Sequence, residues 1–153
     1  MDLLTLTRGR NIRVGLKAQR KEDAIELLLD CLLEEGAIPG EGRAQVLDAI
    51  MRRERKLSTG LERGIAIPHG TTEVVPSEVG ALGVFPEGVP FESVDDHETR
   101  IVILLVTPPA NRHKHVVNLA KIAAQLLQID VRQALLSAKC RADALAAIRE
   151  GGA

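Results

Sequence analysis

Two stretches in the first third of the chain repeat apolar residues at the three- and four-residue spacing of an amphipathic helix. The first begins at about Lys21 and continues to Gly36, a residue type that commonly ends a helix. The second begins at about Arg43, or one residue earlier, and gathers its apolar side chains on one face: Val46, Leu47, Ile50 and Met51. The pattern predicts two packed helices, and the second carries Arg53 near its end.

Shorter apolar runs, bounded by glycine, proline or charged residues, predict strands. They lie at residues 12–16, 64–67, 79–85 and 101–106. The last run is continuously apolar, which is typical of a strand buried on both faces of a sheet, and Thr107, Pro108 and Pro109 end it. The third run is followed by a turn-rich segment at residues 86–90.

Three further helices are predicted in the last third of the chain. They lie at about residues 116–128, 131–137 and 141–149. Strands interleaved with helices favour an α/β sandwich, although the pattern does not determine the order of the strands. The 153 residues contain no internal repeat, low-complexity tract or interdomain linker, so we expect a single domain over residues 1–153.

Composition narrows the classes of partner. Hydrophobic residues make up 45% of the chain, but Phe85 and Phe91 are its only aromatic residues, so the core must be built from aliphatic side chains. With so few aromatic residues, stacking on nucleic-acid bases is not expected. The formal net charge is −1, from 20 basic and 21 acidic residues, which provides no global field for nucleic acid or an anionic membrane.

The cysteines and the N-terminal segment indicate the compartment. Cys31 and Cys140 are far apart and fit neither a disulfide framework nor a metal site, and no apolar segment at the N-terminus resembles a signal peptide or a membrane span. We therefore expect a reduced, cytoplasmic protein without cofactor or metal. Cys31 lies within an apolar helix and is interpreted as core packing.

The strongest candidate for chemistry is His69, which follows Pro68 and precedes Gly70. Proline cannot donate to a sheet ladder, so the strand at residues 64–67 should end there and leave His69 at its tip. A glycine next to the histidine permits a sharp turn or close approach of a partner. Near neutral pH a histidine is partly unprotonated, so one ring nitrogen can attack phosphorus while a hydrogen bond orients the other.

Residues that suit a phosphate group precede His69. Ser58, Thr59 and Gly60 form an open loop with hydroxyl and backbone N–H groups, and Arg53 adds a planar guanidinium that matches phosphate oxygens. Each of these features also occurs without function, as a turn or a solvated helix end. Together they suggest phosphoryl transfer through a phosphohistidine.

The complete pattern, RE-x-x-x-STG-x-x-x-GIAIPHG, closely resembles the active-site signature of the enzyme IIA domains of the fructose/mannitol type (type 2) in the sugar phosphotransferase system. That family includes stand-alone nitrogen-regulatory members, which a one-domain chain resembles most. The resemblance implies a mixed central β-sheet flanked by helices on both faces. It also implies that His69 accepts a phosphoryl group from the phosphocarrier HPr or an HPr-like protein, and that an enzyme IIB domain or a regulatory target protein lies downstream.

The same resemblance identifies a second histidine. The family places it at the start of a helix that reads approximately H-x-x-x-L-A-x-L-A-x-x-L, and here His115 is followed by Leu119, Ala120, Ile122, Ala123 and Leu126. This spacing selects His115 over His113. The resemblance implies that His115 lies beside His69 and, with Arg53 and Thr59, stabilises the phosphoryl group.

The signature departs from the family pattern at one place. Leu61, Glu62 and Arg63 stand where family members commonly have a small segment that contains glycine. An acidic side chain that pointed inward would disfavour a phosphoryl group, whereas a solvent-facing Glu62 would be screened. Glu62 and Arg63 also bear on which partner docks, so the downstream partner, sugar-specific or nitrogen-regulatory, stays open.

Two other classes of function are compatible with parts of the sequence. His113 and His115 are spaced so that they can share a metal ion, as in a metal-dependent hydrolase, but no carboxylate follows closely. The chain can also be a regulatory binding module of the same fold that is never phosphorylated. Retention of Arg53, Thr59, His69 and His115 together favours phosphoryl transfer, and His97 is given no role.

Overall fold

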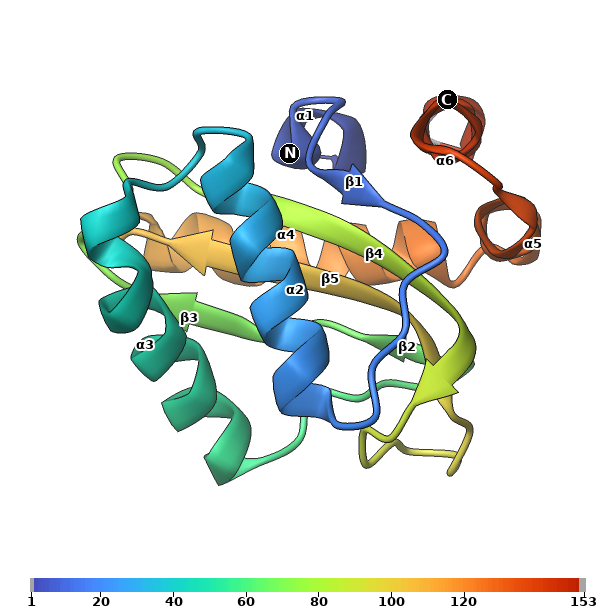
Figure 1. Cartoon of the computed structure of the whole chain (residues 1–153), viewed down its shortest axis with the longest axis horizontal. Helices are drawn as coiled ribbons and strands as arrows, with labels where there is room; N and C mark the ends of the chain where they lie inside the picture. The colour runs from blue at the N-terminus through green and yellow to red at the C-terminus, as the bar shows by residue number, and fades with distance from the viewer. Residues whose placement is uncertain (1, 152–153) are drawn as a thin grey trace.

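A mixed β-sheet of five strands forms the centre of the fold in the computed structural model, which describes residues 2–151 (Figure 1). The strands are β1 (Ile12–Arg13), β2 (Ile65–Ala66), β3 (His69–Thr71), β4 (Val79–Val89) and β5 (Thr99–Thr107). The α-helices are α1 (Leu3–Thr7), α2 (Lys21–Glu34), α3 (Arg43–Lys56), α4 (Arg112–Leu126), α5 (Ile129–Ser137) and α6 (Arg141–Gly151). Two short 3-10 helices are η1 (Gly40–Gly42) and η2 (Pro109–Asn111).

The sheet places the two longest strands at its centre. Its order is β1-β4-β5-β2, and β3 also pairs with β5, beyond the end of β2. β4 and β5 are antiparallel, whereas β1 on β4 and both β2 and β3 on β5 are parallel. His69 is paired in register with Leu105, so the central strand fixes the position of the candidate nucleophile.

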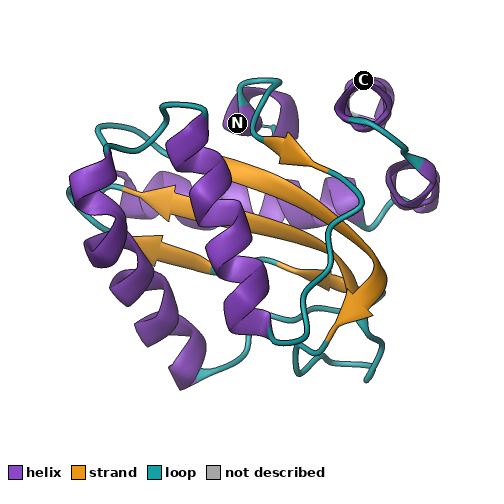
Figure 2. Ribbon diagram, viewed as in Figure 1, coloured by secondary structure: helices purple, strands orange, loops and turns teal. Residues whose placement is uncertain are grey.

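Helices cover both faces of the sheet (Figure 2). Two separate hydrophobic clusters are buried between the helices and the sheet. One cluster joins α2 and α3 to one face, and the other joins α1, α4, α5 and α6 to the opposite face. Alternate residues of β5 contribute to the two clusters, with Val102 and Leu104 in the first and Ile101 and Ile103 in the second. The predicted mixed sheet with helices on both faces, and the predicted burial of β5 on both faces, are therefore confirmed.

Several predicted boundaries are wrong. β1 is only two residues long, and α1 has no counterpart in the predictions because five residues give too short a pattern. β4 continues through the segment at residues 86–90 that was expected to be a turn, as far as Val89. A register shift between Val84 and Val89 accommodates Pro86, which has no N–H to donate. α4 begins at Arg112 rather than at residue 116, so His115 lies in its first turn.

The expected end of the strand at Pro68 is also only partly correct. The chain leaves the ladder after Ala66 and rejoins it at His69, which is the first residue of β3. Pro68 cannot donate a hydrogen bond, but its carbonyl oxygen accepts one from the Leu105 N–H at 3.0 Å. Proline thus interrupts the strand without ending it, and His69 is held inside the sheet rather than at a free tip.

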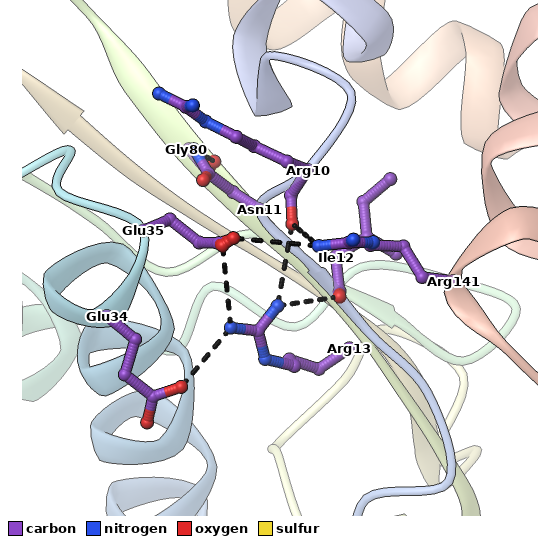
Figure 3. Close-up of polar contacts among 8 residues, drawn as sticks. All are labelled: Arg10, Asn11, Ile12, Arg13, Glu34, Glu35, Gly80 and Arg141. Carbon is purple, nitrogen blue, oxygen red and sulfur yellow. Dashed lines mark hydrogen bonds and ion pairs between the residues drawn. The ribbon is translucent and has the colours of Figure 1, made fainter.

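Side chains cover the outer edge of the sheet at β1 (Figure 3). The Arg13 guanidinium donates to the carbonyl oxygens of Ile12 at 3.0 Å and Arg10 at 3.4 Å, and Arg141 also donates to the Arg10 carbonyl at 3.4 Å. Glu35 pairs with both guanidinium groups, at 4.0 Å and 3.5 Å. Carbonyl groups that are occupied in this way are not available to pair with another strand, so the network protects the edge and ties α6 to α2.

Candidate active site

The signature residues come together where the end of α3, the start of β3 and the start of α4 meet. Gly70 makes this meeting possible, because a Cβ atom there would lie 2.9 Å from the backbone nitrogen of Ile50 and 3.0 Å from the carbonyl carbon of Ala49. The absent side chain lets α3 pack directly on β3. Arg53, one helical turn beyond Ile50, is thereby carried to the same cavities as His69.

His69 is half-buried, and the hydrogen bond on its ring selects one tautomer. Its Nδ1 lies 2.8 Å from the carbonyl oxygen of Ile67. A carbonyl oxygen only accepts, so Nδ1 carries the proton and Nε2 retains its lone pair. Burial lowers the pKa of His69, and the charges of His115 and Arg53 lower it further against the opposing effects of the Ile67 carbonyl and Glu54. The lowered pKa favours the neutral ring at neutral pH.

His115 lies beside His69, as the resemblance implied, with the ring centroids 5.2 Å apart and the planes inclined by 54°. Its Nδ1 lies 2.6 Å from the Glu78 carboxylate and 2.9 Å from the Thr107 hydroxyl. Because an ionised carboxylate only accepts, Nδ1 carries a proton, and Nε2 is the nitrogen left for the cavity that His115 lines. His113 is exposed and lines neither cavity beside His69.

Glu78 is a site residue that the sequence did not reveal. It is buried directly before β4, and its carboxylate accepts hydrogen bonds from His115, Thr107 and Asn118, the last at 2.6 Å. Burial acts to raise the pKa of this carboxyl, but the three hydrogen bonds outweigh it and the pKa is lowered. Glu78 is 37 positions from His115, and its only sequence signal is an acidic residue at the start of a buried strand.

Arg53 and Thr59 also reach the site, but in different ways. The Arg53 guanidinium donates to the carbonyl oxygen of Leu57 at 2.7 Å. Thr59 is buried, and its N–H and hydroxyl donate to the two carboxylate oxygens of Glu54 at 2.9 Å and 2.5 Å. The Thr59 hydroxyl therefore already donates its proton to Glu54, which is only 2% exposed. The two hydrogen bonds to Glu54 fix the shape of the loop at Thr59. The predicted contact of Thr59 with a phosphoryl group stays a prediction.

His69 and Arg53 separate two cavities of opposite character. The first, of about 400 Å³, contains no acidic side chain and is called the basic cavity. Its lining residues are Ala49, Arg52, Arg53, Lys56, His69, Gly70, Thr71, Arg112 and His115.

The second cavity, of about 660 Å³, is mostly apolar and is called the apolar groove. Its lining residues are Arg53, Leu57, Ser58, Thr59, Gly60, Leu61, Ile67, His69, Glu92, Ser93, Val94, Leu119, Ala120 and Ala123. Glu62 lines neither cavity and is exposed, so solvent screens its charge.

The residues expected of a metal-dependent hydrolase do not assemble. Among residues 2–151, no group of three or more histidine, cysteine, aspartate or glutamate side chains is arranged to hold a metal ion. His115 already uses Nδ1 on Glu78, and His113 faces solvent. Among the helices of residues 2–151, none combines the length and apolar character needed to cross a bilayer.

The chain is similar to known proteins of one family. Residues 5–151 match the family model described as "Phosphoenolpyruvate-dependent sugar phosphotransferase system, EIIA 2". The chain is 32% identical over 140 residues to the fructose-specific EIIA component of Haloferax volcanii, covering 92% of this chain and 90% of that protein. It is 28% identical to the fructose-specific EIIABC component of Bacillus subtilis, but spans only 22% of that longer protein.

Solved structures resemble the fold along most of its length. The nitrogen regulatory protein IIA-Ntr from Neisseria meningitidis superposes with a TM-score of 0.82 at 25% identity, covering 94% of this chain and 97% of that one. Enzyme IIAMTL from Escherichia coli, solved in complex with phosphorylated enzyme IIBMTL, superposes with a TM-score of 0.74 at 28% identity, covering 92% of this chain and 95% of that one. Both sugar-specific and nitrogen-regulatory proteins are thus similar to this chain.

Proposed function

We propose that this chain, which belongs to the EIIA 2 family of the phosphoenolpyruvate-dependent sugar phosphotransferase system, carries a phosphoryl group on Nε2 of His69. One observation carries the proposal above all others. The Ile67 carbonyl accepts the Nδ1 proton of His69, so a neutral ring keeps a lone pair on Nε2. His69 lines both cavities, Arg53 lines the same two, and His115 lies beside His69. A nucleophile whose tautomer is fixed and whose charge is suppressed by burial needs no further base.

The proposed donor is HPr or an HPr-like phosphocarrier whose own phosphohistidine is brought in line with Nε2. The N–P bond of the donor breaks as the new N–P bond to His69 forms, and no proton moves to or from Nε2 in this step. Phosphoryl transfer depends mainly on alignment and on stabilisation of charge on the equatorial oxygens. Arg53 and His115 supply that stabilisation from the basic cavity, and Lys56 and Arg112 add positive charge around it.

The phosphoryl group has two proposed uses. It is passed to an enzyme IIB domain, a use supported by the solved complex of enzyme IIAMTL with phosphorylated enzyme IIBMTL. Alternatively it acts as a signal to a regulatory target, a use supported by the similarity to IIA-Ntr. Phosphorylation adds about −1.5 to −2 charges, by analogy with other phosphorylated side chains, and this changes which surfaces dock on the basic cavity. In both uses the chain acts as one phosphotransferase domain.

The test is incubation with phosphoenolpyruvate, enzyme I and HPr, followed by measurement of acid-labile phosphohistidine. Wild-type protein should be labelled, His69→Ala should carry no label, and His113→Ala should be labelled as well as the wild type. His113 is the matched control because it is a nearby histidine that lines neither cavity. Absence of label on the wild type would instead support the alternative of a regulatory module that is never phosphorylated.

A further inference from the structure

One wall of the apolar groove is formed by Glu92, Ser93 and Val94, in the connection between β4 and β5. Val94 is apolar, yet 81% of its surface is exposed. We call these three residues the wall, and residues 58–63 the signature loop. The wall touches the signature loop through the backbone, since a Cβ atom on Gly60 would lie only 2.3 Å from the Glu92 carbonyl oxygen. The wall and the signature loop are therefore in direct contact, and any side chain at position 60 would push them apart.

Asp95 fastens the end of the wall to the signature loop. Its carboxylate accepts the Arg63 N–H at 2.9 Å, the His97 N–H at 3.2 Å and a ring nitrogen of His97 at 2.7 Å. Arg63 has a φ of 62°, a left-handed conformation that costs roughly 1–2 kcal/mol for a residue with a side chain. The hydrogen bond to Asp95 offsets that cost, so Asp95 and Arg63 form a clasp between two loops that are distant in sequence. Arg63 belongs to the segment in which the signature departs from its family pattern.

A second anchor holds the beginning of the wall. The Lys21 ammonium lies 2.8 Å from Glu92 and 3.5 Å from Glu54, the carboxylate that binds the Thr59 N–H and hydroxyl. Ser93 and Val94 lie between the two anchors. An exposed apolar side chain fixed at both flanks loses little additional freedom when a partner covers it, and that is the property of a docking contact.

The apolar surface continues from Val94 to other parts of the groove. Leu57, at the end of α3, is 71% exposed, and Leu119, Ala120 and Ala123 of α4 complete the lining. Exposed apolar side chains gathered around a reactive group commonly mark an interaction site. His69 lies in the same groove, so a protein that docks there can place its phosphoryl group next to Nε2.

We propose that Val94 is a specificity-determining contact for the phosphorylated HPr-like donor, and that Asp95 is the positioning residue that holds Val94 in place. The inference rests on the proposed function and deepens it, because it assigns partner choice to the wall rather than to the exposed Glu62. Val94 makes the contact, and the clasp ties the segment that carries Val94 to the segment that carries Arg63.

The experiment compares two phosphoryl donors on the full chain. Phosphorylated HPr must dock before transfer, whereas phosphoramidate is a small donor that releases ammonia and needs no docking. For Val94→Asp, the KM for phosphorylated HPr should rise by at least about tenfold, which corresponds to about 1.4 kcal/mol of docking energy. Asp95→Ala should raise the same KM by roughly threefold to tenfold. In both variants the rate of His69 labelling by phosphoramidate should stay within about twofold of wild type.

The matched control is Ile129→Asp, because Ile129 is also an exposed apolar residue, 58% exposed, but it lines neither cavity beside His69. It should leave the KM for phosphorylated HPr and the rate of labelling by phosphoramidate unchanged.

An unchanged KM for HPr in Val94→Asp and Asp95→Ala would overturn the inference while leaving the proposed function intact. An equal loss with both donors would also overturn it, since the wall would then act on His69 itself. A raised KM only for onward transfer to an enzyme IIB domain would assign the wall to the acceptor and contradict the proposal for the donor. Failure of wild-type protein to be labelled by either donor would instead overturn the proposed function.

Discussion

His69 and His115 are both histidines, and their ring centroids lie 5.2 Å apart. They differ in the group that accepts the hydrogen bond from Nδ1. His69 donates from Nδ1 to a neutral backbone carbonyl two residues earlier in the chain. His115, on α4, donates from Nδ1 to the buried carboxylate of Glu78, directly before β4. A neutral acceptor fixes the tautomer without stabilising a positive ring, which suits a nucleophile. The carboxylate fixes the orientation of the His115 ring and leaves Nε2 for the basic cavity that His115 lines, which suits a positioned partner of the nucleophile.

Removing the His115 ring should have the largest effect on the rate of phosphoryl transfer. In His115→Ala, transfer from phosphorylated HPr should slow by about 100-fold, the lower end of the range for removing one group that stabilises charge in the transition state, while His69 is still labelled. His115→Asn is the companion variant, since its amide can still donate to Glu78 and so protects the fold. Initial rates of labelling measure the effect. A wild-type rate in both variants would mean that the proximity of His115 has no consequence for transfer.

Replacing the carboxylate behind His115 should have a smaller effect. Glu78→Gln puts an uncharged amide, with one accepting oxygen and one donating NH2 group, where His115, Thr107 and Asn118 now donate to two carboxylate oxygens. His115 therefore loses its negatively charged acceptor. Transfer should slow roughly tenfold, the lower limit typical of residues that orient a functional histidine. The direct signature is the pattern of ¹⁵N chemical shifts of the His115 ring. Glu73→Gln, an exposed acidic residue nearby in the chain, is the control. A wild-type rate together with unchanged ¹⁵N shifts of the His115 ring in Glu78→Gln would refute the positioning role.

The sequence predicted the parts of this site that depend on local pattern. Apolar periodicity located α2 and α3 and hence Arg53, and the resemblance located His69 and selected His115 over His113. Glu78 was not predictable in the same way, because its meaning comes from a hydrogen bond to a residue 37 positions away. The clasp at Asp95 is likewise invisible in the sequence, since it joins loops that are 32 positions apart.

Errors in the predicted strands have a related cause. The sequence rule that proline cannot donate to a ladder is correct, but it overlooks the proline carbonyl, which still accepts from Leu105 at Pro68. Pro86 is tolerated for a different reason, because β4 shifts its register on β5 between Val84 and Val89. Both outcomes depend on the neighbouring strand β5, which a reading of local residues does not include.

The smallest expected effect concerns the charge of His69. Its pKa lies below the ordinary value of 6.5, chiefly because of burial, so the neutral nucleophile persists at pH 6.5 and is lost only as the pH falls through the lowered pKa. Labelling by phosphoramidate, corrected for ionisation of the donor, should therefore reach half its maximal rate below pH 6.5. A midpoint at or above pH 6.5 would show that burial does not suppress the charge.

Arg53 offers a way to sharpen that result. Its positive charge lowers the pKa of His69, so Arg53→Gln should raise the midpoint of an NMR titration of the His69 ring. Arg55→Gln is the control, since Arg55 is exposed on the same helix and lines neither cavity. Equal midpoints in wild type and Arg53→Gln would remove Arg53 as a source of the shift.

The nitrogen that carries the phosphoryl group tests the account most directly. Protein labelled by phosphorylated HPr and examined by ¹H–¹⁵N and ³¹P NMR should show the N–P bond on Nε2 of His69, with the proton still on Nδ1 and His115 unmodified. This follows from the Ile67 carbonyl oxygen, which lies 2.8 Å from Nδ1 and accepts its proton in a hydrogen bond. A phosphoryl group on Nδ1 of His69, or on either nitrogen of His115, would contradict the division of roles between the two histidines.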